Sequence, residues 1–517
     1  MRRGRRGAAR TTRAMSVLTG LAVAAVVAAG CSGGDAEGGA GLAATTTTLA
    51  RHAPETMSWP TAGGDLANAR AVPGARLATA TIDRVTELWR APLPDAGALS
   101  TTPLVVDGTV YVQGASGQVV AIDAASGEVV WSSEPTGANI GPFGVAVDDD
   151  RVYALDGSQG VVALDRADGS EFWSADVTPT PTVGIDIQPI VVDDLVIVSS
   201  VPVSIGGIYT PGDRGVVYAL DAATGAVRWS FDTVEGDLWG HPEVNSGGGA
   251  WYPPAVDEER GLVYVGVANP APFPGTPEWP NGTSRPGPNL YTNSVVALDL
   301  ASGDLRWYHQ VTPHDLFDRD QVHTLLVEVD GEQLVVSAGK SGVLVGLDPG
   351  DGTVRWEQAV GEHRNDDLDA LPGPTEIAPG TYGGVLTPPS TADGVVYAAV
   401  VNAPATLAPD QTAYFGAEMG QADGEVVAVD AGDGTVLWST PVAGDPLGGT
   451  AVVGDLVVTA LLDGTLVALD RTDGEAVWTM AAGGGVNGWL AALDDRLIVP
   501  VGNADPPALL AVGLRQP

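Results

Sequence analysis

The residues most able to do chemistry in this chain run from Thr312 to Asp320 and read TPHDLFDRD. His and Asp side chains flank Leu316-Phe317, so the segment is too polar for a strand interior. It follows directly on a predicted β-hairpin that spans Ser294 to His309. Because a rigid hairpin fixes where the loop begins, the segment is a candidate site for charged, hydrogen-bonding chemistry.

A second candidate is Lys340, in AGKSG, which is the one lysine beside 24 arginines. A lysine ammonium is a compact point charge, unlike the planar guanidinium of arginine. Either this position needs a compact ammonium, or the lone lysine is a mutational accident.

A hairpin that recurs seven times must position these residues. In each copy an apolar strand ends in Asp, a Gly follows four residues later, and a Trp follows four residues after the Gly. The Asp and Gly are typical of a tight turn, and the Trp is expected to pack between adjacent sheets. The shortest Trp-to-Trp spacings, 40 and 42 residues, match a four-stranded propeller blade. The copies are Asp123/Gly127/Trp131, Asp165/Gly169/Trp173, Asp221/Gly225/Trp229, Asp299/Gly303/Trp307, Asp348/Gly352/Trp356, Asp430/Gly434/Trp438 and Asp470/Gly474/Trp478.

The two ends of the chain supply an eighth copy. Leu509 to Leu514 resemble the strand that elsewhere precedes the Asp, and Glu87 to Trp89 resemble a Trp-bearing strand without a partner. Pairing them closes the ring and leaves no open sheet edge. The sequence therefore predicts an all-β fold: an eight-bladed β-propeller of four-stranded antiparallel blades over residues 58–517, with the N- and C-terminal strands in one blade.

The N-terminus has the features of an export signal. Met1 to Arg13 carries six Arg and no acid, and Ala14 to Ala29 is a run of mainly small and apolar residues. Ala28-Ala29-Gly30-Cys31 resembles a bacterial lipobox, in which Cys31 becomes lipidated; the alternative is an ordinary secretory signal with an incidental Cys. Residues 1–30 are thus predicted to be a signal peptide, and residues 31–57 a flexible Gly/Ala/Thr linker. The expected product is an exported lipoprotein on the outer face of the cytoplasmic membrane, held there only by its lipid.

The net charge argues against nucleic acid as a partner. The chain has 64 acidic and 25 basic residues, and removal of residues 1–30 would take away six of the basic ones. So acidic a surface repels phosphate backbones and anionic lipid headgroups.

From Trp59 onward the chain resembles the pyrroloquinoline quinone (PQQ) dependent alcohol dehydrogenases and polyvinyl alcohol dehydrogenases. WPTAGGDLANAR at Trp59 is similar to their N-terminal segment, and the seven Trp hairpins are similar to their tryptophan-docking motif. The most specific pieces are Gly247 to Trp251, VYVGVANPAPF at 263–273, and Arg285 to Asp320.

The resemblance implies roles for four residues. Asp318 matches the family's catalytic base, which takes the proton of the substrate hydroxyl, and with Asn269 it matches the calcium site. Trp251 matches the indole beneath the PQQ ring. Lys340 matches a basic residue near the quinone oxygens.

Two departures bear on the cofactors, PQQ and calcium. Thr210 stands where the family has a calcium-binding Glu, so the site lacks one carboxylate unless Asp213 reaches it. Phe143 stands where the family has an Arg, so a quinone with three carboxylates would meet less positive charge.

Two functions of different class follow. One is a quinoprotein dehydrogenase that oxidises an alcohol or polyol outside the cytoplasmic membrane with PQQ and calcium. The other is a degenerate, non-enzymatic propeller that binds a cell-surface protein or polymer as a scaffold.

Overall fold

The structure is a computed structural model that describes residues 58–139, 141–157, 159–178, 182–204, 208–412 and 419–515. The predicted signal peptide, Cys31 and the linker lie outside these ranges. Within them, no helix has the length and apolar character needed to cross a membrane. The helical elements described there are short 3-10 turns: η1 (Ile82–Arg84), η2 (Leu238–Gly240) and η3 (Pro280–Gly282).

Eight four-stranded antiparallel sheets follow one another along the chain, which confirms the predicted eight-bladed propeller. We number the blades in chain order. Blades 1 to 4 are β3 (Leu104–Val106), β4 (Thr109–Gln113), β5 (Val119–Asp123) and β6 (Val129–Ser132); β7 (Val145–Val147), β8 (Arg151–Asp156), β9 (Gly160–Asp165) and β10 (Glu171–Asp176); β12 (Ile190–Val192), β13 (Leu195–Val201), β16 (Val216–Asp221) and β17 (Val227–Asp232); and β19 (Ala255–Asp257), β20 (Leu262–Gly266), β22 (Ser294–Asp299) and β23 (Leu305–Gln310).

Blades 5 to 8 continue the same pattern. They are β24 (His323–Val329), β25 (Glu332–Ala338), β26 (Val343–Leu347) and β27 (Val354–Ala359); β29 (Ser390–Ala392), β30 (Val395–Asn402), β32 (Asp423–Asp430) and β33 (Val436–Val442); β34 (Ala451–Val453), β35 (Leu456–Ala460), β36 (Thr465–Asp470) and β37 (Ala476–Ala481); and β38 (Ala491–Ala492), β39 (Arg496–Val501), β40 (Ala508–Leu514) and β2 (Val85–Pro92).

The other strands are short additions to this frame. They are β1 (Ala71–Val72), which runs parallel to β34; β11 (Gly184–Ile185), on β13; and the pairs β14 (Val203–Ser204) with β15 (Ile208–Tyr209), β18 (Ser246–Gly247) with β21 (Pro270–Ala271), and β28 (Thr375–Ile377) with β31 (Ala405–Leu407).

Among the described residues, tryptophan side chains bond one blade to the next at seven of the eight boundaries, all except the one between blades 7 and 8. On the outermost strand β23, for example, Trp307 is buried between exposed neighbours, and its indole Nε1 donates a hydrogen bond of 3.0 Å to the carbonyl of Pro349 in blade 5. Six more indoles make the same bond at 2.7 to 3.1 Å: Trp89 to Ala124, Trp131 to Arg166, Trp173 to Ala222, Trp229 to Leu300, Trp356 to Ala431 and Trp438 to Arg471. The predicted packing of the Trp between sheets is therefore correct.

The repeat Gly serves both the turn and this contact. Gly352 has φ +73°, which favours glycine, and a Cβ added there would lie 2.5 Å from the Trp307 ring. The Asp contributes to the same turn, because Asp348 Oδ1 accepts the backbone N–H of Gly350 at 2.9 Å. The Asp, Gly and Trp of the repeat thus form one inter-blade joint.

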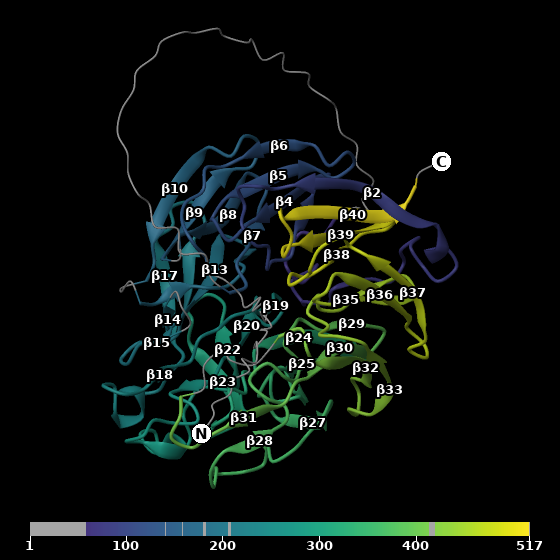
Figure 1. Cartoon of the computed structure of the whole chain (residues 1–517). Helices are drawn as coiled ribbons and strands as arrows, with labels where there is room; N and C mark the ends of the chain where they lie inside the picture. Colours follow the sequence, from purple (N-terminus) through teal and green to yellow (C-terminus); the bar gives the residue numbers. More distant parts are fainter. Residues whose placement is uncertain are drawn as a thin grey trace, which may run out of the picture. The chain divides into compact units, whose positions relative to one another are not determined.

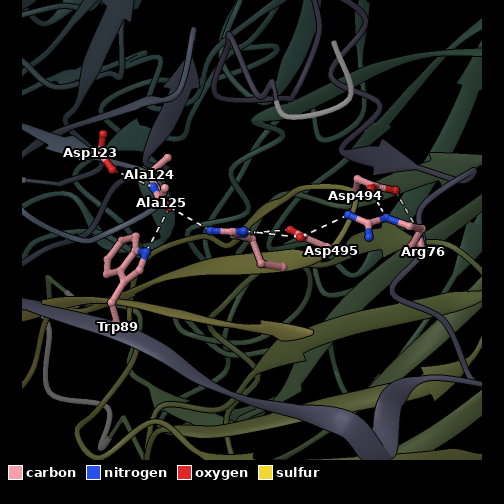
Figure 2. A network of polar contacts seen from close by, with 8 residues as sticks. Arg76, Trp89, Asp123, Ala124, Ala125, Asp494 and Asp495 are labelled. Atoms are coloured by element: carbon pink, nitrogen blue, oxygen red, sulfur yellow. Dashed lines mark hydrogen bonds and ion pairs between the residues drawn. The ribbon is translucent and has the colours of Figure 1, made fainter. Parts of the chain in front are cut away.

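Strands from both ends of the described chain form blade 8. β2 pairs antiparallel with β40, from Val85 opposite Leu514 to Pro92 opposite Ala508, and Figure 1 shows the two strands side by side. Blade 8 joins blade 1 through the carbonyl of Ala124, which accepts the Trp89 indole N–H at 3.0 Å (Figure 2). The same carbonyl accepts the buried Arg496 guanidinium at 2.9 Å. The predicted closure by terminal strands is confirmed.

The segment from Trp59 to Arg70 spans the inner strands of several blades. The Arg70 guanidinium is fully buried and donates to the carbonyls of Ala62, Thr450 and Leu490 at 2.7 to 2.9 Å. Four backbone carbonyls of the segment accept N–H groups from blades 4 to 7: Leu66 from Val256, Ala67 from Leu326, Ala69 from Thr391 and Arg70 from Val452. This segment therefore forms hydrogen bonds with the innermost strands of four of the eight blades.

Deletion of residues 509–517 should open the ring. It removes most of β40, so β2 and β39 would each present an unpaired edge, and we expect aggregation or loss of cooperative unfolding in a thermal melt. Deletion of residues 515–517, beyond the strand, is the control. Parent-like melting of the longer deletion would contradict the role of blade 8 in closure.

Trp307→Ala should lower the free energy of unfolding by about 3 to 5 kcal/mol, because a large buried side chain and its hydrogen bond are lost. Chemical denaturation measures this change. Arg306→Ala, at an exposed position of the same strand, is the matched control and should leave the midpoint near that of the parent. An unchanged midpoint for Trp307→Ala would mean that the indole does not hold the blades together.

Candidate functional site

Asp318 lies in the loop between β23 and β24, which is folded around a buried carboxylate. Asp315 accepts the backbone N–H groups of Phe317 at 2.7 Å and Arg319 at 2.8 Å. Leu316 and Phe317 pack in a hydrophobic cluster, so apolar burial anchors the polar loop. Asp318 itself has φ +66°, a conformation that is uncommon for a residue with a Cβ and is enriched at functional sites.

The Lys340 ammonium lies between two carboxylates. Its Nζ is 3.0 Å from Asp318 Oδ2 and 2.6 Å from Asp320 Oδ2. The backbone N–H of Lys340 also donates to the carbonyl of Asp320 at 2.9 Å, which fixes the turn after β25 against the loop. A single ammonium is therefore shared by two mostly buried acids.

Asn269 and Tyr209 extend this cluster. The backbone N–H of Asn269 donates to Asp320 Oδ1 at 2.7 Å, and the Tyr209 hydroxyl donates to Asn269 Oδ1 at 3.0 Å. Loops of blades 3, 4 and 5 thus meet at one hydrogen-bonded group. We call Tyr209, Asn269, Asp318, Asp320 and Lys340 the acidic cluster.

Burial controls the protonation of the acidic cluster. It raises the pKa of Asp318 to about 8 and also raises the pKa of Asp320, although Lys340 acts in the opposite direction on both. Burial disfavours the Lys340 ammonium, but the two carboxylates outweigh it and keep its pKa well above the ordinary value. With a pKa of about 8, the Asp318 carboxyl group is mostly protonated at neutral pH, and the Lys340 ammonium balances Asp320; a cation bound here would displace the proton of Asp318.

Within the described ranges, Trp251, Thr210 and Phe143, the other residues singled out from the sequence, form no hydrogen bond with the acidic cluster. Trp251 is half-buried, and its indole nitrogen has no hydrogen-bond partner among the described residues. Thr210 follows Tyr209 directly, and its carbonyl accepts the N–H of Asp213 at 3.2 Å. Phe143 is buried in an apolar cluster with Tyr153 and Ile185, so no positive charge occupies its position.

Sequence reasoning missed two residues of the acidic cluster, Asp320 and Tyr209, and one buried acid outside it, Asp186. Asp320 ends the segment TPHDLFDRD, and its spacing of two from Asp318 is the sequence signal that could have found it; Tyr209 lies in no motif. Asp186 is fully buried with both carboxylate oxygens unpartnered among the described residues. Burial raises the pKa of Asp186 well above its ordinary value, which favours the neutral acid, a hydrogen-bond donor.

The donor chemistry of the acidic cluster fits a hard cation such as Ca²⁺. Asp318, Asp320 and Asn269 offer two carboxylates and an amide oxygen, the ligand types that calcium prefers. Across the described ranges, no group of three or more His, Cys, Asp and Glu side chains is arranged to hold a metal. Further oxygen ligands would have to come from the backbone, from water or from a bound molecule.

Comparison with known proteins supports the family resemblance. A family model described as "Glucose/ethanol/alcohol dehydrogenase, beta-propeller domain" matches residues 175–357, and one described as "Outer membrane protein assembly factor BamB" matches residues 80–201 and 422–506. The quinohemoprotein alcohol dehydrogenase ADH IIB of Pseudomonas putida is 29% identical over 62% of this chain and 50% of its own length. That of Comamonas testosteroni is 27% identical over 70% of this chain and 57% of its own.

Solved structures share the fold. The structure of the Comamonas testosteroni quinohemoprotein alcohol dehydrogenase covers 90% of this chain and 82% of its own at 24% identity, with a TM-score of 0.76. BamB of Moraxella catarrhalis covers 83% of this chain and 97% of its own at 18% identity, with a TM-score of 0.52. The chain spans about half the length of the curated relatives it matches.

Lys340→Met should destabilise the calcium-free protein, and more so as the pH rises. Without the ammonium, the pKa values of Asp318 and Asp320 rise further in the folded state, so the native protein holds protons that the unfolded chain releases. The variant therefore keeps its stability at acid pH and loses it as the pH rises through the folded-state pKa values of the two acids. At alkaline pH its free energy of unfolding should be lower than that of the parent by about 3 to 5 kcal/mol.

Urea denaturation at pH 5, 7 and 8.5 with a chelator measures this loss. The double variant Lys340→Met/Asp320→Asn is the control and should recover part of the stability, because one buried charge is removed with its partner. A pH-independent loss would contradict an electrostatic role for Lys340.

Proposed function

Because the chain carries a β-propeller domain of the PQQ-dependent dehydrogenase type, we propose that the acidic cluster oxidises an alcohol or polyol with PQQ and calcium. The observation that carries this proposal is the placement of Asp318, a mostly buried carboxyl group 3.0 Å from the Lys340 ammonium. The same ammonium contacts Asp320, which accepts the backbone N–H of Asn269. These residues come from different loops and have no evident structural need for one another. A buried carboxyl group whose surroundings raise its pKa to about 8 is a candidate for acid–base chemistry near neutral pH.

Asp318 is the general base in this proposal. Its carboxylate accepts the proton of the substrate hydroxyl, and Lys340 and the buried surroundings hold it in place. PQQ, when bound, supplies a two-electron acceptor for the hydride that leaves the carbinol carbon, so the alcohol becomes a carbonyl compound. The proton remains on Asp318 until water or buffer removes it.

The remaining residues hold the cofactors. Asn269 and Asp318 would ligate calcium, and Asp320 adds a carboxylate that offsets part of the loss at Thr210. Trp251 would lie under the quinone ring, and its unpartnered indole nitrogen is consistent with a ligand nearby. Lys340 would pair with the quinone oxygens in place of one of its two acids.

A scaffold function is the second candidate. Thr210 brings no carboxylate, Phe143 brings no cation, and the BamB family model matches the parts of the chain on either side of the central blades. In this case the acidic cluster is a remnant and the propeller binds a cell-surface protein or polymer. For either function, the strongly acidic chain is expected not to bind nucleic acid.

The place of action is also part of the proposal. Residues 1–30 and Cys31 have the pattern of a lipoprotein signal, so we propose export and attachment to the outer face of the cytoplasmic membrane through the lipid alone. Both functions agree with that location.

Thr210→Glu should raise the affinity for calcium, on the order of tenfold, because it restores a carboxylate to an incomplete ligand set. Weak binding of calcium and PQQ, with little turnover, is expected in the parent protein. Calorimetric calcium titration of both proteins, with and without PQQ, measures the change. Thr353→Glu, at an exposed turn, controls for added charge alone.

In the Thr210→Glu protein, Asp318→Asn should abolish alcohol oxidation without unfolding the chain. Unchanged or weaker calcium binding in Thr210→Glu would contradict the incomplete-site interpretation. If neither protein binds calcium or PQQ, the scaffold function is the one that stands.

A further inference from the structure

A pocket of about 340 Å³ adjoins the acidic cluster. Tyr209 lines it, and the Tyr209 hydroxyl is the group that bonds to Asn269, so one side chain links the pocket to the cluster. Its walls come from separate loops of blades 3, 4 and 6. This volume is at the lower end of the range for small-molecule sites.

The pocket carries negative charge. Its lining includes Glu243 and Glu278, and none of the described residues that line it is Lys or Arg. A hydrogen bond from His241 holds the pKa of Glu243 below its ordinary value, so this carboxylate is charged at neutral pH. The lining residues of the pocket therefore carry a net negative charge.

Asp213 and Arg285 are two charged residues that contact the lining of the pocket. Asp213 has a buried carboxylate oxygen without a partner among the described residues, and its carbonyl accepts the hydroxyl of the lining residue Ser246 at 2.9 Å. Arg285 is fully buried and donates to the carbonyl of Pro272, another lining residue, at 2.9 Å. Its other hydrogen bonds go to Asn289 of its own loop and to the carbonyl of Asp315 in the loop between β23 and β24. One buried cation against the carboxylates of Glu243, Glu278 and Asp213 leaves the charge at the pocket negative.

The pocket also offers aromatic surface. Trp279 and Tyr209 both line it. Aromatic faces beside carboxylates bind ammonium groups, because the ring quadrupole and the acids attract the same positive charge. A neutral alcohol can donate its hydroxyl to a carboxylate, but it lacks the positive charge that the rings and the two glutamates attract.

We propose that this pocket selects a small cationic alcohol, either an amino alcohol or a quaternary ammonium alcohol, and presents its hydroxyl to Asp318. The turnover of such a substrate rests on the proposed function, whereas its binding does not. The acidic chain as a whole assists by raising the local concentration of cations near its surface.

Two probes of equal shape test the proposal. Choline carries a trimethylammonium group, and 3,3-dimethylbutan-1-ol carries a neutral tert-butyl group at the same position. Calorimetric titration of the metal- and quinone-free protein should show choline binding at least tenfold tighter, roughly the value of a cation beside two acids and an aromatic ring. Equal binding of both probes would overturn the proposal.

Glu243→Gln/Glu278→Gln identifies the charges responsible. It should weaken choline binding by about tenfold and leave the neutral alcohol unchanged, while Glu128→Gln, at an exposed turn of blade 1, should change neither. Equal weakening of both probes, or no change, would overturn the proposal. Choline binding without oxidation in the presence of calcium and PQQ would count against the proposed function only.

Discussion

The joint between each tryptophan and the next blade is the interaction on which the rest of the structure depends. A blade presents apolar surface on both faces, and it is stable only when neighbours cover both. The indole covers the turn of the next blade and donates one directed hydrogen bond, as Trp307 does to Pro349. Repetition of this joint, with the pairing of β2 and β40, turns separate hairpins into a closed ring.

Ring closure also explains how a site forms from distant residues. Long insertions lie between strands of the central blades, such as the 27 residues that separate Gly266 of β20 from Ser294 of β22. Because the blades are held rigidly, loops on the same side of the ring meet. Asn269, Asp318 and Lys340 thereby share one hydrogen-bonded group, and no one of them needs another for its own local structure.

Unbalanced charge connects the acidic cluster with the pocket beside it. Two buried acids share one ammonium, and the neighbouring pocket adds Glu243 and Glu278 with no cation among the lining residues. At the cluster, burial raises the pKa of Asp318 to about 8, so at neutral pH a proton supplies positive charge that a bound cation could supply instead. A metal ion at the cluster and a cationic alcohol in the pocket would both supply that charge.

The sequence by itself determined the architecture, because a hairpin is a local object. The spacing of Asp123, Gly127 and Trp131, which occurs seven times, predicts within nine residues both the tight turn and the tryptophan that packs on the next blade. The unpaired strands at the two ends predict that the ring closes. The resemblance also pointed to Asp318, Asn269 and Lys340. Only the tertiary structure decided that Asp320 shares the ammonium and that Tyr209 reaches Asn269, since loops without periodicity carry no signal of where they end.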